Sequence, residues 1–73
     1  MNMTPVKSSQ IESIGHYEET QVLCVRFKSG DTYEYDGVSP EVFNDFLTAE
    51  SVGAYFGKNI RGQYEYTKLE RDE

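Results

Sequence analysis

Hydrophobic and polar side chains alternate most clearly between residues 21 and 28, where Leu23, Val25 and Phe27 share one face. This period of two is typical of a β-strand that buries one face and exposes the other. Residues 32–36 continue the alternation in a second, shorter run. The two runs therefore predict a β-hairpin with one hydrophobic face.

The connection between these two strands decides whether their hydrophobic faces coincide. A loop of two residues would pair Val25 with Glu34 and divide the large side chains between opposite faces of the sheet. A loop of three residues, with Gly30 in the left-handed conformation of a bulge, pairs Val25 with Tyr33 instead. We predict the three-residue loop, because it places every large side chain of the hairpin on the same face.

A first helix is predicted to begin at Ser39-Pro40 and to end near Ala49-Glu50. Serine is a favourable N-cap, and proline suits the first helical position because the N–H that it lacks would have no partner there. Hydrophobic residues then recur at helical spacing and form one stripe. The stripe consists of Val42, Phe43, Phe46 and Leu47.

A second helix is predicted to begin after the N-cap Ser51 and to stop at Gly62. Gly53 and Gly57 lie on one face of this helix. A glycine inside a helix costs about 1 kcal/mol relative to alanine, so a compensating reason is expected. We expect that these glycines allow close backbone approach to the hairpin or to the first helix.

The remaining segments predict two further strands and two irregular ends. Residues 11–17 form an irregular first strand, in which Gly15 suggests a bulge or a close backbone approach. A last short strand is predicted to begin near Tyr64. We expect residues 1–8 to be a flexible lead and residues 70–73 to be a charged tail.

Together these elements predict a single α+β domain over residues 1–73. The expected fold is a small antiparallel sheet of three or four strands, with two short helices packed on one face. A chain of this length buries only about 60% of its unfolded surface, so nearly every large hydrophobic side chain is needed inside. The predicted core consists of Leu23, Val25, Phe27, Tyr33, Tyr35, Phe43, Phe46, Leu47, Phe56 and Ile60.

The composition is that of a small folded domain, with 37% hydrophobic residues. The longest strictly hydrophobic run, residues 22–25, is far shorter than the roughly 20 residues of a membrane span. The polar first ten residues lack the hydrophobic segment of a signal peptide. We therefore expect a cytoplasmic monomer without membrane contact.

The net charge of −6 argues against loose binding to a polyanion, which requires a cationic surface. The acidic residues are unevenly placed, however. Glu65 is the only acid between Ser51 and Lys68, and this span also holds Lys58 and Arg61. Two interpretations remain open: a local basic patch on an acidic protein, or acids that only provide a solubilising surface.

Arg61 and Lys58, with Tyr55 or Tyr64 beside them, form the candidate nucleic-acid-binding site. A guanidinium group suits a phosphate or a carboxylate, and an aromatic ring stacks on an unpaired base. Such a site favours short single-stranded RNA, because the charge is too small for duplex binding. Alternatively, Arg61 complements the dipole at a helix end or packs over a tyrosine ring.

Two pairs of tyrosines with a spacing of two also allow two interpretations. Tyr33 and Tyr35, or Tyr64 and Tyr66, could stack bases as in sheet-based RNA-recognition domains. Alternatively, the rings belong to the core. We predict the core for both pairs, because Tyr33 and Tyr35 share the hydrophobic face of the hairpin.

No catalytic, metal or cofactor site is predicted. Cys24 lies among aliphatic residues in the middle of a strand, where a thiol usually serves as a small buried hydrophobic group. His16 has no nucleophile or metal ligand near it in the sequence. Phosphate-binding loops, catalytic triads and metal-ligand spacings are also missing from the sequence. We therefore expect a protein that is not an enzyme.

The chain resembles the KTSC domain family over nearly its whole length. Several short motifs carry the resemblance in the family's order. They are Val6-Lys7-Ser8-Ser9, Ile11, Ile14-Gly15, Leu23, Val25, Phe27, Gly30, Tyr33-Glu34-Tyr35, Val38-Ser39-Pro40, Ser51, Gly53, Tyr55-Phe56, Ile60-Arg61 and Tyr64-Glu65-Tyr66. Val38-Ser39-Pro40 differs slightly from the Val-Pro that is usual in the family.

The resemblance implies a stand-alone member of a family whose domain is also appended to the C-terminus of some lysyl-tRNA synthetases. That setting implies RNA or tRNA-associated binding, and no catalytic residues come with the family. We therefore predict a small non-catalytic binding module for single-stranded RNA or tRNA. The alternative is a module that binds a protein partner and makes no contact with nucleic acid.

Overall fold

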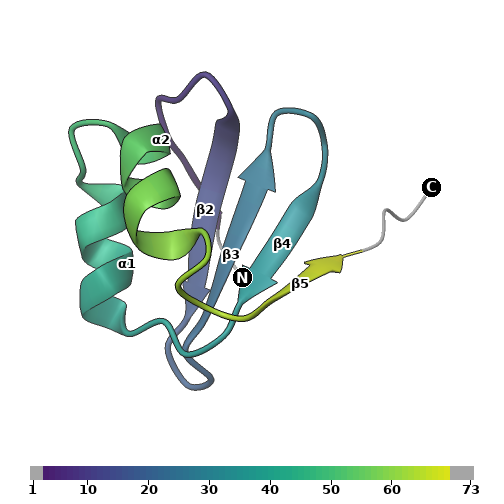
Figure 1. Cartoon of the computed structure of the whole chain (residues 1–73), viewed down its shortest axis with the longest axis vertical. Coiled ribbons are helices and arrows are strands. Elements are labelled where there is room, and N and C mark those ends of the chain that lie inside the picture. The colour runs from purple at the N-terminus through teal and green to yellow at the C-terminus, as the bar shows by residue number, and fades with distance from the viewer. Residues whose placement is uncertain (1–2, 70–73) are drawn as a thin grey trace.

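The computed structural model describes residues 3–69, and its framework is an antiparallel sheet of five strands (Figure 1). The strands lie side by side in sequence order. They are β1 (Thr4–Pro5), β2 (Ile11–Tyr17), β3 (Val22–Phe27), β4 (Thr32–Tyr35) and β5 (Tyr66–Leu69).

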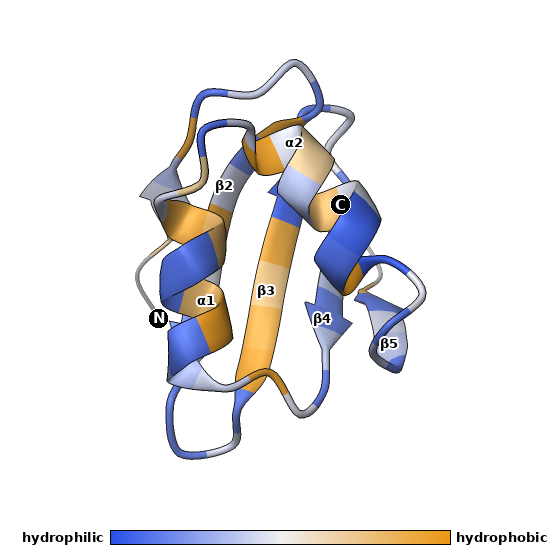
Figure 2. Ribbon diagram, turned by 60° about the vertical axis from the view of Figure 1, so that its left-hand side comes forward, coloured by the Kyte–Doolittle hydropathy of each residue, from blue (hydrophilic) through white to orange (hydrophobic). Residues whose placement is uncertain are grey.

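The helical part of the chain connects β4 to β5 and covers one face of the sheet (Figure 1 and Figure 2). It consists of α1 (Pro40–Leu47), α2 (Val52–Tyr55) and a π-helical segment, η1 (Phe56–Ile60). The α+β class and the single helical layer agree with the prediction. No helix within residues 3–69 is long and hydrophobic enough to cross a membrane.

The predicted count of three or four strands is wrong, because the sheet has five. The additional strand, β1, lies within residues 1–8, which we expected to be a lead, and it pairs with β2. A strand of two residues is too short to show an alternating pattern, so no hydrophobic periodicity predicts it. The predicted tail, residues 70–73, lies outside the described residues.

The β3–β4 hairpin has the predicted register. Leu23 pairs with Tyr35 and Val25 with Tyr33, so these large side chains lie on the face that the helices cover. Gly30 has a φ of 101°, the left-handed conformation that the three-residue loop requires. In Figure 2, β3 is the most hydrophobic strand and runs beneath the helical layer.

Strand β2 contains an irregularity, but not at Gly15. The pairing with β3 shifts between Ile11 and Ser13, so Glu12 is the extra residue of a bulge. In a regular strand, residues three apart would point to opposite faces. The bulge allows both Ile11 and Ile14 to be fully buried in the same core.

Helix α1 begins as predicted. The Ser39 hydroxyl accepts a hydrogen bond from the Val42 N–H at 3.2 Å, and Pro40 occupies the first turn. Val38, the residue before the cap, is anchored to the turn that precedes β3: its N–H donates to the Gln21 carbonyl at 2.8 Å. These bonds fix where the chain leaves the sheet and starts the helical layer.

The second helix begins at the predicted cap but changes its winding. The Ser51 hydroxyl accepts from the Ala54 N–H at 3.2 Å. After one turn of α-helix, the Arg61 N–H bonds to the Phe56 carbonyl, five residues earlier, at 2.8 Å. This π-type turn was not predicted. The chain leaves it at Arg61 in an extended conformation, and Gly62 follows with a φ of 79°.

The predicted core is confirmed. Six of its ten residues are buried and the other four are half-buried against them. Burial also extends to residues that we did not predict, namely Ile11, Ile14, Val38 and Val52. The prediction for Tyr66 is wrong, because its side chain is 61% exposed, whereas Tyr64 is half-buried against the core.

The expected close approach at the two helical glycines is not observed. A Cβ atom built on Gly57 would have no neighbouring atom within 4 Å, and one on Gly53 would meet only the Ser8 hydroxyl at 3.5 Å, an ordinary contact. Gly57 is in fact exposed. The prediction failed because the π turn directs this residue toward solvent.

Candidate functional site

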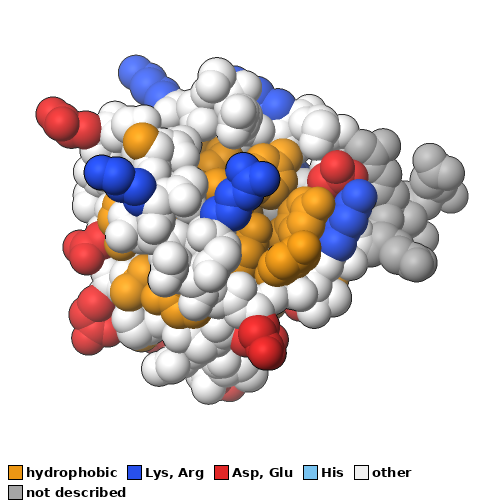
Figure 3. Space-filling view, in the orientation of Figure 1, with side chains coloured by type: hydrophobic (Ala, Val, Ile, Leu, Met, Phe, Trp, Pro, Cys, Tyr) orange, Lys and Arg blue, Asp and Glu red, His pale blue; other side chains and the backbone are white. Residues whose placement is uncertain are grey.

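A groove with aromatic walls lies between the end of η1 and strand β5, on the sheet face that carries the helices. Its volume is about 330 Å³. We call it the aromatic groove and define it by Phe27, Tyr33, Tyr35, Phe56, Arg61 and Tyr66. Figure 3 shows hydrophobic surface open to solvent on this face, with basic side chains over it and beside it.

The strand register builds the inner part of the groove. Tyr35 faces Tyr66 across β4 and β5, and Tyr33 is one pair further along the same face. The Tyr66 ring rests against both, with centroid distances of 5.5 Å to Tyr33 and 5.7 Å to Tyr35. One side of the Tyr66 ring is thereby supported, and the rest of it is exposed.

The opposite wall comes from η1. The Phe56 ring meets Phe27 and Tyr35 edge-to-face at 5.4 and 5.8 Å, which fixes η1 against the sheet. The chain leaves η1 at Arg61, and this arginine lines the groove. The π turn therefore determines where the only arginine of the groove is placed.

Arg61 is the charge that a ligand would meet. Within residues 3–69 the structure contains a single ion pair, and Arg61 is not part of it. Its side chain is exposed, so it is available to an anion. Burial, followed by the nearby Tyr33 and Tyr66, raises the pKa of Tyr35, whereas Arg61 acts in the opposite direction. The guanidinium is thus close enough to act electrostatically on the groove.

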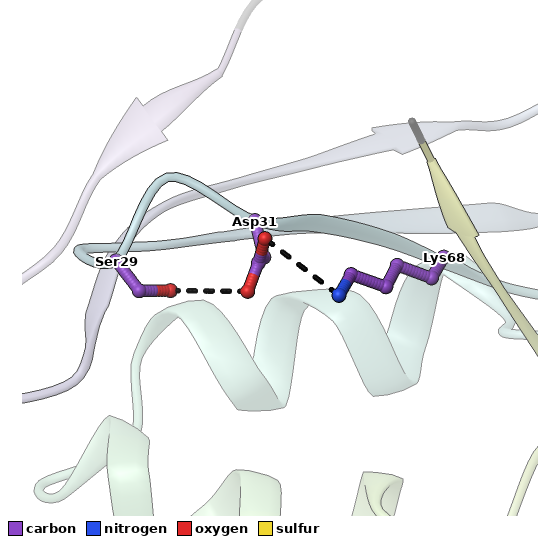
Figure 4. A network of polar contacts seen from close by, with 3 residues as sticks. All are labelled: Ser29, Asp31 and Lys68. Carbon is purple, nitrogen blue, oxygen red and sulfur yellow. Dashed lines mark hydrogen bonds and ion pairs between the residues drawn. The ribbon is translucent and has the colours of Figure 1, made fainter. Parts of the chain in front are cut away.

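The ion pair lies at the other side of the groove and joins β5 to the β3–β4 loop (Figure 4). Lys68 Nζ is 3.8 Å from Asp31 Oδ1, and the Ser29 hydroxyl donates to Asp31 Oδ2 at 3.4 Å. Lys68 was part of the span in which we suggested a basic patch. Its charge is offset by Asp31, which leaves Arg61 and Lys58 as the cations of that span that are in no ion pair within residues 3–69.

The predicted site residues fall into two groups. Arg61 lines the aromatic groove, and Lys58 is exposed on η1 three residues before it. Tyr55 and Tyr64 are not among the groove residues. Tyr55 stacks on Phe46 at 5.5 Å, and burial, then the Asp45 carboxylate and Tyr64, raise its pKa. The ring that shares the groove with Arg61 and is open to solvent is Tyr66.

The sequence contained only part of the signal for this arrangement. The period of two in Tyr64-Glu65-Tyr66 indicates a strand, but it does not say which strand β5 pairs with or in which register. Pairing with the β4 edge brings Tyr66 next to Tyr33 and Tyr35. The same pairing leaves Tyr66 beyond the area that the helices cover, so the Tyr66 ring is exposed instead of buried.

A second, wider hollow of about 810 Å³ lies beside the start of α1 and includes His16, Phe43 and the acidic residues Glu18 and Glu19. The His16 imidazole serves the fold: its Nε2 bonds to the Val38 carbonyl at 2.7 Å, and its ring stacks on Phe43 at 5.1 Å. Because two carboxylates line this shallow hollow, it is a poor site for a phosphate.

The thiol of Cys24 is buried, as predicted, and lies on the sheet face away from the helices. Burial, with the carboxylate of Glu34, raises its pKa to about 11, so the reactive thiolate is disfavoured near neutral pH. Within residues 3–69, no three His, Cys, Asp or Glu side chains gather as ligands for a metal ion.

Comparison with known families identifies this fold. The sequence model of the KTSC domain matches residues 7–64. The chain belongs to the KTSC domain family. A crystal structure of a KTSC domain protein from Yersinia pestis has a TM-score of 0.89 to this chain and is 34% identical, covering 94% of this chain and 97% of that one.

KTSC relatives occur both alone and within larger proteins. A protein of Tsukamurella paurometabola is 42% identical over 67 residues, which is 92% of this chain and all of the relative. A lysine–tRNA ligase of Nostoc punctiforme is 36% identical over 63 residues, or 86% of this chain and 11% of the ligase. The similarity therefore covers an appended KTSC domain, and KTSC is not known as an enzyme domain.

Proposed function

We propose that this KTSC domain is a non-catalytic module that binds single-stranded RNA, or the unpaired nucleotides of tRNA, at the aromatic groove. The observation that carries the proposal is the presence, in one groove, of the exposed Tyr66 ring and of Arg61, which is in no ion pair within residues 3–69. A guanidinium binds phosphate, and an exposed ring stacks a base. Together they supply the two contacts on which single-strand binding relies.

The occurrence of KTSC domains in lysine–tRNA ligases supports the same class of ligand. The ligases of Nostoc punctiforme and Trichormus variabilis carry the matching segment, and their names give tRNA as what they act on. A domain joined to such an enzyme belongs to the same molecule that acts on tRNA. This association favours an RNA contact for the groove.

The charge of the chain limits how this contact is made. A net charge of −6 repels an extended polyanion, so attraction has to come from the local cations Arg61 and Lys58. Few phosphates can then be neutralised, and affinity should be modest and should fall as salt rises. The proposal is therefore for short, unpaired RNA and excludes tracking along a duplex.

Fluorescence anisotropy with a labelled single-stranded RNA tests the proposal, at low and at near-physiological salt. The wild-type chain should bind at low salt, and Arg61→Ala should weaken binding by at least about tenfold, the typical effect of losing a charged hydrogen bond. Arg26→Ala is the matched control. Arg26 is an exposed arginine on β3, and it points to the other face of the sheet.

Absence of RNA binding at low salt, or equal loss of affinity in Arg61→Ala and Arg26→Ala, would overturn the proposal. The groove would then be assigned to a protein partner, the alternative that the exposed Tyr66 ring also allows.

A further inference from the structure

We infer that the aromatic groove takes a single nucleotide unit, with one base stacked on Tyr66 and one phosphate at Arg61. The inference rests on the proposed RNA function in that the nucleotide would belong to an RNA strand. It specifies the site size, which distinguishes this groove from the long channels of general single-strand binding proteins. The volume of the groove, the number of exposed rings and the available charge each indicate a site for one nucleotide.

The volume of the groove sets the first limit. About 330 Å³ lies at the lower end of the roughly 300–1,000 Å³ that is usual for small-ligand sites. The β3–β4 loop bounds the groove through Ser29 and Asp31, and Asp31 is tied to Lys68 of β5. A strand that continued in this direction would meet the Asp31 carboxylate. The space therefore suits one nucleotide.

The exposed rings set the second limit. Proteins that hold several unpaired bases offer a row of aromatic faces on which successive bases stack. Among residues 3–69, the only large hydrophobic side chains that are exposed are Tyr66 (61%) and Tyr17 (42%). Tyr17 is on β2, two strands away from the groove-forming pair β4–β5. Phe27 and Tyr35 each meet Phe56 edge-to-face instead, and the half-buried Tyr33 meets Phe27 in the same way. One ring remains for one base.

The charge sets the third limit. Of the charged groups that line the groove, Asp31 is in an ion pair with Lys68, and Arg61 makes no ion pair with an acid of residues 3–69. One guanidinium can bind one phosphate through two parallel hydrogen bonds. A site that neutralises one phosphate of a single strand predicts a slope of about −0.7 in a plot of log affinity against log salt.

Competition against labelled RNA tests the inference. Adenosine 5′-monophosphate should displace the RNA, adenosine should require at least tenfold higher concentration, and inorganic phosphate should have no effect at matched concentration. Tyr66→Leu should weaken binding at least about fivefold, since stacking is worth about 1–3 kcal/mol per base. Tyr66→Phe should retain affinity within about twofold. Tyr17→Leu, which removes the other exposed ring, is the matched control and should leave affinity unchanged.

The outcomes separate the inference from the proposed function. RNA binding with a salt slope steeper than about −2, which corresponds to three phosphates, would overturn the single-nucleotide site and leave RNA binding intact. If RNA binds but adenosine 5′-monophosphate does not displace it, the single-nucleotide site is likewise overturned and RNA binding stands. Nucleotide binding without RNA binding, seen as groove-residue shifts in NMR spectra, would support the site and overturn the RNA function. Binding of neither would overturn both.

Discussion

Tyr35 and Tyr66 lie opposite each other on β4 and β5, with ring centroids 5.7 Å apart, yet only one of the two rings is buried. Tyr35 is 4% exposed and belongs to the core, whereas Tyr66 is 61% exposed at the aromatic groove. The pair therefore marks the boundary between the core and the surface that is open to a ligand. Substitutions at these two positions should separate stability from binding.

Tyr35→Ala is expected to lower the free energy of unfolding by roughly 3–5 kcal/mol, as is typical for removal of a buried aromatic ring. Tyr66→Ala should cost only about 0.5–1.5 kcal/mol, because it loses ring contacts but little buried area. Urea unfolding of both variants, followed by circular dichroism, measures the difference. Equal losses would show that Tyr66 belongs to the core, as the sequence alone suggested.

Phe46 is the residue on which α1 depends most. It is fully buried, and its ring stacks on Tyr55 at 5.5 Å and on Phe56 at 6.3 Å, which joins α1 to α2 and η1. Phe46→Ala should cost roughly 3–5 kcal/mol, a large part of the 5–15 kcal/mol by which domains are usually stable. The exposed neighbour Asp45→Ala should change stability by no more than about 0.5 kcal/mol. Similar melting temperatures for the two variants would contradict this packing.

Gly57 and Gly37 should respond to alanine in opposite ways, although a Cβ atom at either position would meet no atom within 4 Å. Gly37 has a φ of 75°, which disfavours any residue with a Cβ, so Gly37→Ala should destabilise by about 1–2 kcal/mol. Gly57 is helical, and alanine should stabilise it by about 0.5–1 kcal/mol. Thermal unfolding measures both changes. If Gly57→Ala is destabilised instead, the backbone at Gly57 is closely packed, as the sequence analysis expected and the structure does not show.

The predictions that succeeded depend on local chemistry. The left-handed Gly30 fixes the hairpin loop, and a serine followed by helical spacing marks the start of each helix at Ser39 and Ser51. Each of these signals lies within a few residues of the feature that it determines. The strand β1 and the π turn were missed because neither has such a signal: β1 consists of two residues, and the π turn depends on how Phe56 packs against the sheet.

The groove also combines a feature that the local sequence indicates with one that only the pairing of distant strands determines. Arg61 was identified from the uneven placement of acids along the chain, which the sequence displays directly. Its tyrosine neighbours are set by the pairing of β4 with β5, which joins residues about thirty positions apart and brings Tyr66 to Tyr35. No local pattern determines that pairing. Sequence reasoning therefore singled out Arg61, which lines the groove, and assigned Tyr66 to the wrong environment.

Cys24 predicts how stability changes at alkaline pH. Burial, and then the Glu34 carboxylate, raise the pKa of its thiol from 9.0 to about 11 in the folded chain. Between these values the unfolded chain has lost the proton while the folded chain still holds it. The folded state then binds more protons, so the free energy of unfolding falls as pH rises. The contribution of the Cys24 thiol to the free energy of unfolding is fully present below about pH 9 and lost by about pH 11.

Cys24→Ala isolates the contribution of this thiol from that of the other groups that lose a proton at alkaline pH. Urea unfolding at several pH values from 8 upward should show a shallower decline for Cys24→Ala than for the wild type. Glu34→Gln should fall between the two, because it removes the negative charge of the acceptor, 3.7 Å from the thiol, and leaves the burial in place. If Cys24→Ala and the wild type decline in parallel, the thiol has the same pKa in both states. Its burial beneath the sheet surface would then not raise its pKa.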